Sequence, residues 1–305
     1  MFLKMKHTLK VVIALVLLFF IAQIAGLLII NNYIDHKKSI ETHAIEWKPL
    51  PFNIERPQVE NQSTSFVYII IAILIGTALV LLLIKLNLVG IWKFWLFSTL
   101  WITLTFAFAA FINNFLAAVL AFVVSVLKLY KPNVLIQNVS EIFVYGGLAA
   151  IFVQIVNLFA AFMLLILISI YDYIAVYKTK HMVTLANFQS KSNVFAGLFI
   201  PYEKNGIRLK HEVSPYPGTL QKKSNVAVLG GGDIGFPLIF AGVVMSGLMM
   251  KEDVLIGFFK TLIIPAIVSL ALLALLIKGQ HNKFYPAMPV LSLGCFVGYV
   301  IVWLI

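Results

Sequence analysis

Long apolar runs are the feature that most limits what this chain can fold into. A helix that crosses a bilayer needs about 20 mostly apolar residues, and runs of roughly this length recur along the whole sequence. They predict nine membrane-spanning helices, at residues 11–30, 65–84, 91–112, 114–130, 136–155, 157–177, 226–248, 254–277 and 285–305. The expected fold class is therefore an all-α, multi-pass integral membrane protein.

The composition excludes a soluble enzyme and argues against a nucleic-acid partner. Of the 305 residues, 61% are hydrophobic and 11% are charged, whereas a soluble domain carries about 25% charged residues. The net charge of +11 comes from Lys and Arg in short segments between apolar runs, where such residues set membrane orientation. Cys295 is the only cysteine, so we expect no internal disulfide, no metal cluster and no cofactor.

The spans are expected to form one membrane-embedded domain over residues 1–305. Six spans occupy residues 11–177, a polar loop follows at 178–225, and three spans occupy 226–305. The first run, Val11 to Ile30, is longer than the apolar region of a signal peptide and lacks a good cleavage site after it. We therefore interpret it as a retained span.

Basic residues predict the orientation. Nine spans place the two termini on opposite sides of the membrane. If the N-terminus is cytoplasmic, the inner segments hold 17 basic residues and the outer segments hold 5. Because cytoplasmic segments carry the excess of Lys and Arg, we expect a cytoplasmic N-terminus, an extracytoplasmic C-terminus and a cytoplasmic loop at 178–225. The cell membrane is the expected location.

Two acidic residues lie well inside predicted spans. They are Asp172 and Asp233, while the other ten of the twelve Asp and Glu residues fall in loops or at span borders. A carboxylate in a bilayer costs a few kcal/mol or more and usually faces a polar cavity. Asp172 lies roughly 9 Å and Asp233 roughly 13 Å from the cytoplasmic ends of their helices. On consecutive antiparallel spans, two acids at such similar depths can face each other.

Paired carboxylates can hydrolyse a peptide bond. Two close carboxyl groups in a low dielectric do not both ionise and share a proton. The ionised member can take a proton from an attacking water, and the protonated member can donate to the oxyanion or the leaving amine. Glycines 230–232 precede Asp233, and they allow a close backbone approach. The alternative for either acid is a structural role, capping a broken helix or pairing with a buried donor.

Three short motifs lie in order on the sixth, seventh and ninth predicted spans. They are "YDYIAVYKTKHM" at 171–182, "GGGD" at 230–233 and "PAMP" at 286–289. Together they resemble the presenilin and signal peptide peptidase family of intramembrane aspartyl proteases, which carry a Gly-x-Gly-Asp motif. In size and compactness the chain is most similar to the archaeal presenilin-like members.

The resemblance implies which residues form the site. Asp172 and Asp233 would be the catalytic pair. The residues expected to shape the site and line the substrate groove are Tyr171, Gly230, Gly231, Gly232, Pro286, Ala287 and Met288. Two of them depart from the family pattern, since Met288 stands where the family has Leu, and Gly231 stands where it has a larger apolar residue.

The resemblance also implies the partners. Substrates would be transmembrane helical proteins that unwind locally before cleavage, and the segment at 224–230 would offer them a strand edge. The loop of 48 residues is much shorter than that of the animal presenilins, which act with partner subunits. We therefore expect activity without an obligatory partner subunit, while a homo-oligomer stays open.

Two other functions would also use acidic residues inside a membrane. Intramembrane acids beside broken helices also mark the ion paths of cation- or proton-coupled transporters, but no second Gly-rich broken span matches the first. A prepilin-peptidase-like protease would also use a Gly-x-Gly-Asp acid, and the Pro-Ala-Met motif and nine spans argue against it.

Overall fold

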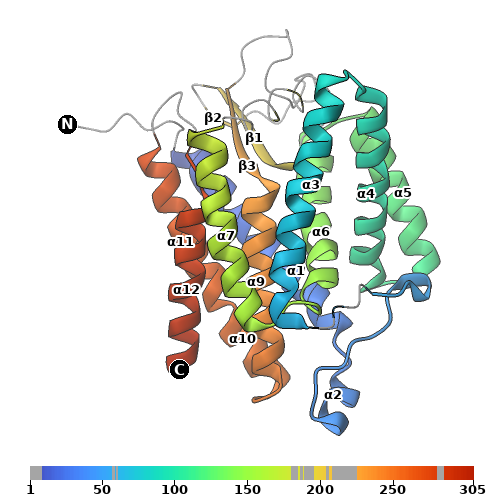
Figure 1. Ribbon diagram of the computed structural model, residues 1–305, viewed down its shortest axis with the longest axis vertical. Helices are drawn as coiled ribbons and strands as arrows, with labels where there is room; N and C mark the ends of the chain where they lie inside the picture. Colours follow the sequence, from blue (N-terminus) through green and yellow to red (C-terminus); the bar gives the residue numbers. More distant parts are fainter. Residues whose placement is uncertain are drawn as a thin grey trace.

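Long helices dominate the architecture (Figure 1). The computed structural model describes residues 9–56, 59, 61–179, 185, 188, 196–203, 206–207, 225–279 and 285–305. The helices are α1 (Leu9–Tyr33), α2 (His36–Thr42), α3 (Ser65–Lys85), α4 (Val89–Ala109), α5 (Asn114–Tyr130), α6 (Val134–Phe152), α7 (Leu158–Tyr177), α9 (Gly231–Met249), α10 (Val254–Thr261), α11 (Ile263–Lys278) and α12 (Met288–Leu304). Two short 3-10 turns, η1 (Pro51–Asn53) and η2 (Gln62–Thr64), lie between α2 and α3.

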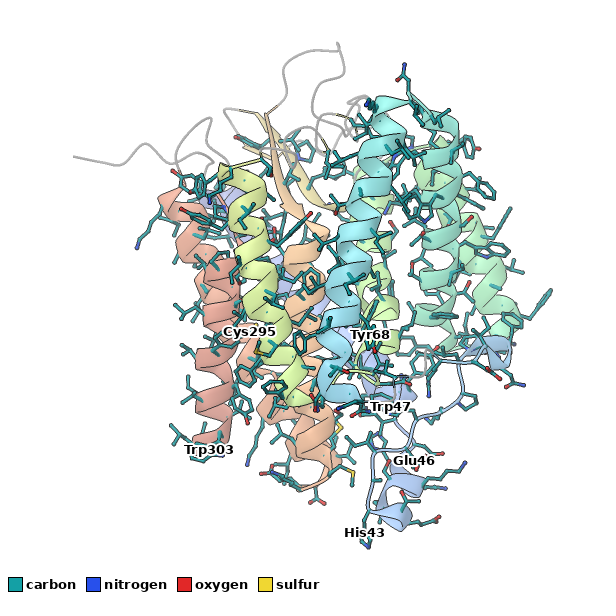
Figure 2. All side chains as sticks on the ribbon, viewed as in Figure 1. His43, Glu46, Trp47, Tyr68, Cys295 and Trp303 are labelled. Carbon is teal, nitrogen blue, oxygen red and sulfur yellow. The ribbon has the colours of Figure 1, made fainter. Side chains whose placement is uncertain are left out.

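The helices have the length and surface of membrane spans. In the described part of the chain, seven helical stretches are long and apolar enough to cross a membrane, one of them formed by α10 and α11 together, and α5 and α12 are shorter apolar helices of 17 residues. Large apolar side chains point outward, with Phe94 and Phe115 each 72% exposed, as expected where the surroundings are lipid. Trp303 and Trp47 lie towards the end of the bundle that holds the C-terminus (Figure 2), where interfacial aromatic residues are typical. The chain is a multi-pass membrane protein.

Small residues bring the central helices together. α9 lies against both α1 and α6, and its residues from Pro237 to Ser246 are all buried. A Cβ added at Gly146 on α6 would lie 3.1 Å from the Cα of Gly26 on α1, and one at Gly147 would lie 2.0 Å from the carbonyl oxygen of Thr103 on α4. Close backbone approach through small residues is the usual basis of helix association in lipid.

One predicted span is divided into two helices. The range 254–277 contains α10 and α11, which are separated at Leu262. Pro265 has no N–H to donate to the carbonyl of Thr261, so a continuous helix would lack a hydrogen bond here.

The turn expected between the fifth and sixth spans begins after Phe152, and the Asn157 side chain caps α7 by accepting from Ala160 N at 2.8 Å.

The chain is helical as predicted, except for a small sheet at one end of the bundle (Figure 1). Its strands are β1 (Gly197–Glu203), β2 (Gly206–Ile207) and β3 (Asn225–Gly230), in the antiparallel order β2-β1-β3. The helix predicted at 226–248 therefore begins at Gly231. The reason is local: residues 226–229 alternate between half-buried and buried, as in a strand, and they pair with β1.

We predict that Gly147→Ala destabilises the fold. Its methyl group would collide with backbone rather than with a flexible side chain, so the free energy of unfolding should fall by about 1–3 kcal/mol, as in other overpacked cores. Gly76→Ala in α3 is the control, because nothing lies within 4 Å of its added Cβ. Thermal unfolding in detergent should separate the two variants, and equal melting temperatures would contradict this packing.

Candidate active site

Asp172 is held at the junction of α7 and α12. Its side chain is buried on α7, five residues before the helix ends, and its Oδ2 accepts a hydrogen bond of 3.1 Å from the backbone N–H of Met288. Met288 is the first residue of α12. The unpaired N–H groups at a helix N-terminus carry a partial positive charge, so this position suits a carboxylate. Ser169 and Ser292 join the same two helices, with 2.9 Å between their hydroxyl oxygens.

Asp233 lies in the first turn of α9. Gly230 is the N-cap residue, and its backbone N–H interacts with the Asp233 carboxyl group. This is the contact by which an acid at the third helical position caps its own helix. A Cβ at residue 230 would lie 3.3 Å from Asp233 Oδ2, so glycine leaves room for the carboxyl group. By accessible surface, Asp233 is half-buried and Asp172 is buried.

The structure brings the two acids together. α7 packs against α9, and Asp233 follows the last residue of β3 by three positions. The two carboxyl groups are close enough for the charge of one to act on the other. No third His, Cys, Asp or Glu joins them as a metal site within the described ranges. The arrangement therefore offers an acid and a base, each supported by a helix N-terminus.

The remaining motif residues take different positions around the pair. The Tyr171 hydroxyl lies 3.0 Å from that of Thr77 on α3, so it joins two helices. Pro286 and Ala287 are half-buried in the segment that leads into α12, and Met288 is buried. Met288 contacts Asp172 through its backbone, which explains why Met serves in place of Leu at this position.

The three glycines before Asp233 differ in what surrounds them. A Cβ at Gly232 would meet only Phe236, at 3.4 Å, but a Cβ at Gly231 would lie 2.3 Å from the hydroxyl of Tyr145 on α6. Tyr145 therefore occupies the space that a side chain at residue 231 would need. This contact accounts for the absence of the larger apolar residue that the family pattern has at this position.

A group of polar residues was missed from the sequence. Glu141 was assigned to a span border, yet it is buried within α6 and forms an ion pair with Lys128 of α5, both side chains being 2% exposed. The group lies on α6 at helical spacing, and its members are Gln137, Asn138, Glu141 and Tyr145. Polar residues three or four apart share one face of a helix, and this spacing was the signal that could have revealed them.

This polar face attaches the sheet to the helices. Asn138 donates to Phe199 O at 2.9 Å and accepts from Phe199 N at 3.0 Å, and Gln137 donates to Gly197 O at 3.1 Å. Gly197 of β1 in turn pairs with Gly230 of β3. The backbone that leads into Asp233 is thus fixed to α6 through one intervening strand.

We predict that Asn138→Ala releases β1 from α6. The change removes both hydrogen bonds between the Asn138 amide and the backbone of Phe199, and each hydrogen bond lost costs about 0.5–1.5 kcal/mol. Leu135→Ala is the matched control on α6, because Leu135 is 69% exposed. Thermal unfolding should show a clear loss for Asn138→Ala alone. Equal losses in the two variants would show that this contact does not hold the strand.

Two interacting carboxyl groups inside a membrane helix bundle indicate an intramembrane aspartic protease. A family model described as "Signal-peptide peptidase, presenilin aspartyl protease" matches residues 42–305. The chain therefore belongs to the signal-peptide peptidase and presenilin aspartyl protease family, and it is an aspartic-type intramembrane endopeptidase that acts on transmembrane substrates. This assignment sets the transporter alternative aside.

Solved structures of similar fold agree with this family. One is described as a presenilin family intramembrane aspartate protease in the C222 space group, with a TM-score of 0.60 and 18% identity over 96% of this chain and 98% of that chain. Another, in the P2 space group, has a TM-score of 0.59 and 17% identity over 95% and 96% of the two chains. Sequence comparison with curated proteins finds no significant match.

Proposed function

We propose that Asp172 and Asp233 are the catalytic pair, and that they hydrolyse peptide bonds within transmembrane helices. The observation that supports this most is that the two carboxyl groups, one buried and one half-buried, lie on helices packed against each other, near enough for the charge of Asp172 to act on Asp233. If the two acids only stabilised helix N-termini, one acid at each terminus would be enough, and the two carboxyl groups would not need to lie near each other.

The chemistry needs one water and one shared proton. The ionised carboxylate takes a proton from water as the water oxygen attacks the scissile carbonyl carbon, and the other carboxyl donates its proton to the carbonyl oxygen. The resulting tetrahedral diol collapses when a proton passes to the amide nitrogen, which breaks the carbon–nitrogen bond. The N–H of Met288 keeps Asp172 oriented throughout.

The substrate is proposed to bind as an extended segment beside β3. In the described part of the chain, β3 pairs with β1 along one edge and carries no strand on the other. An added strand gains backbone hydrogen bonds at such an edge. β3 ends at Gly230, three residues before Asp233, so a peptide paired with it would pass the acid. Gly230 and Gly232 would shape this backbone, and Pro286 and Ala287 would line the opposite wall.

The protein is proposed to work as a single membrane-embedded domain of nine spans, without an obligatory partner subunit. The N-terminus and the sheet would face the cytoplasm and the C-terminus the outside, in the cell membrane. In support, the C-terminus lies at the end of the bundle opposite the sheet (Figure 1), and the basic residues favour this orientation.

We predict that Asp172→Asn and Asp233→Asn each abolish cleavage of a transmembrane helical peptide. Neither amide can exchange the shared proton, so cleavage should fall by at least about a thousandfold, since a lost catalytic group costs at least a general acid or base contribution. Asp253→Asn is the control, because Asp253 is exposed at the start of α10 and should stay fully active. Full activity in either catalytic variant, with melting temperatures unchanged, would contradict the proposal.

The orientation predicts which engineered cysteines are reachable from outside. In a Cys295→Ala background, Glu41→Cys on α2 should react with a membrane-impermeant maleimide on intact cells. Lys178→Cys, at the end of α7 nearer the sheet, should react only after permeabilisation. Both positions are exposed. The reverse pattern would show the orientation of signal peptide peptidases.

A further inference from the structure

Tyr145 is a buried polar residue that the catalytic proposal leaves without a role. It lies on α6, one turn from Glu141, and is 6% exposed. Its hydroxyl oxygen is fully buried and has no acceptor within standard hydrogen-bond distance and angle among the described residues, although the Glu141 carboxylate lies close enough to act as one. The ring nevertheless lies where the charges of both Glu141 and Asp233 act on the hydroxyl.

The Tyr145 side chain covers the first turn of α9. Its hydroxyl lies 2.3 Å, and two of its ring carbons 2.8 Å, from the Cβ position of Gly231. A further ring carbon lies 3.8 Å from the Cβ position of Gly235, one turn along the same helix. The hydroxyl therefore meets α9 two residues before Asp233 in sequence.

Other contacts fix both Tyr145 and the turn that it touches. Glu141 is held by Lys128 and by Gln137 Nε2, which lies 3.1 Å from its Oε1. From α1, Gln23 donates from Nε2 to the carbonyl oxygen of Ile234 at 2.9 Å. The first turn of α9 thus lies between a polar contact from α1 and the Tyr145 ring from α6.

The chemistry of Tyr145 suggests why it is placed here. A buried hydroxyl without a well-formed hydrogen bond destabilises the folded state, so its retention calls for a functional explanation. The Asp233 carboxylate is the acceptor closest in sequence to this contact on α9. The nearby Glu141 is already bound by Lys128 and Gln137, so it competes less for the hydroxyl.

We propose that Tyr145 is a positioning residue of the active site, whose ring fixes Gly231 and whose hydroxyl donates to the Asp233 carboxylate when substrate is bound. This inference rests on the proposed function of Asp233. The ion pair between Glu141 and Lys128 holds α6, and with it Tyr145, in place for this contact with α9. Gly231 is part of the same arrangement, because only a residue without a Cβ lets the Tyr145 hydroxyl approach α9 this closely.

The first test removes the hydroxyl and keeps the ring. Cleavage of a fluorescence-quenched transmembrane peptide, selected for cleavage by the unaltered protein, is measured in proteoliposomes for Tyr145→Phe. We expect kcat to fall about tenfold, the effect of one lost hydrogen bond, with KM within about twofold and the melting temperature retained. An unchanged kcat, or a loss that only follows the folded fraction, would overturn the proposal.

The second test examines the contact with Gly231 through a double-mutant cycle. Gly231→Ala should lower kcat strongly, because its methyl group displaces Tyr145. In a Tyr145→Leu background the same methyl group should cost at least about fivefold less, since residues in direct contact are not additive. Gly247→Ala on the same helix is the control, because nothing lies within 4 Å of its added Cβ. Simple addition of the two effects would overturn the contact.

The same assay separates this inference from the proposed function. If Asp233→Asn is inactive and Tyr145→Phe matches the unaltered protein, only the role of Tyr145 fails. If Asp233→Asn keeps full activity, the catalytic pair fails, and any effect of Tyr145→Phe then has another cause.

Discussion

The cost of placing carboxyl groups inside a bilayer governs the rest of this structure. A charge in lipid is expensive unless polar groups surround it, and here the first turns of two helices supply them. Met288 N–H at the start of α12 binds Asp172, and the backbone of Gly230 at the start of α9 contacts Asp233. Because both helices begin at the same end of the bundle, solving the problem for each acid also brings the two acids together.

Beginning α9 at Gly231, just before Asp233, creates a second requirement, because the chain before it is not helical. Extended backbone at the membrane is tolerated only where protein satisfies its hydrogen bonds. β1 meets this need by pairing with β3 and by accepting, at Ala196 just before the strand, from Gly231 N at 3.2 Å. β1 itself depends on Asn138 of α6. The polar face of α6 is thus a consequence of the strand that leads into Asp233.

The sequence predicted the parts of the fold that depend on apolar length. Each of the nine apolar runs contains an apolar helix, and Asp172 and Asp233 could be paired from their depths because a helix has a fixed rise per residue. The sheet was harder to predict, since residues 225–230 are apolar and short, and such runs fit a strand or a buried helix. The division of α10 from α11 follows from a proline, but its position at Leu262 depends on local packing.

The residues around the pair show where such predictions end. Gly231 departs from the family pattern, and no residue adjacent to it in the sequence explains this. The space that a side chain at residue 231 would fill is occupied by Tyr145, which belongs to α6. Glu141 was expected in a loop or at a span border. Its burial depends on Lys128, which belongs to a different helix. A polar residue inside an apolar run is therefore best interpreted together with the polar residues of neighbouring spans at the same depth, since a group buried in lipid must find its partner there.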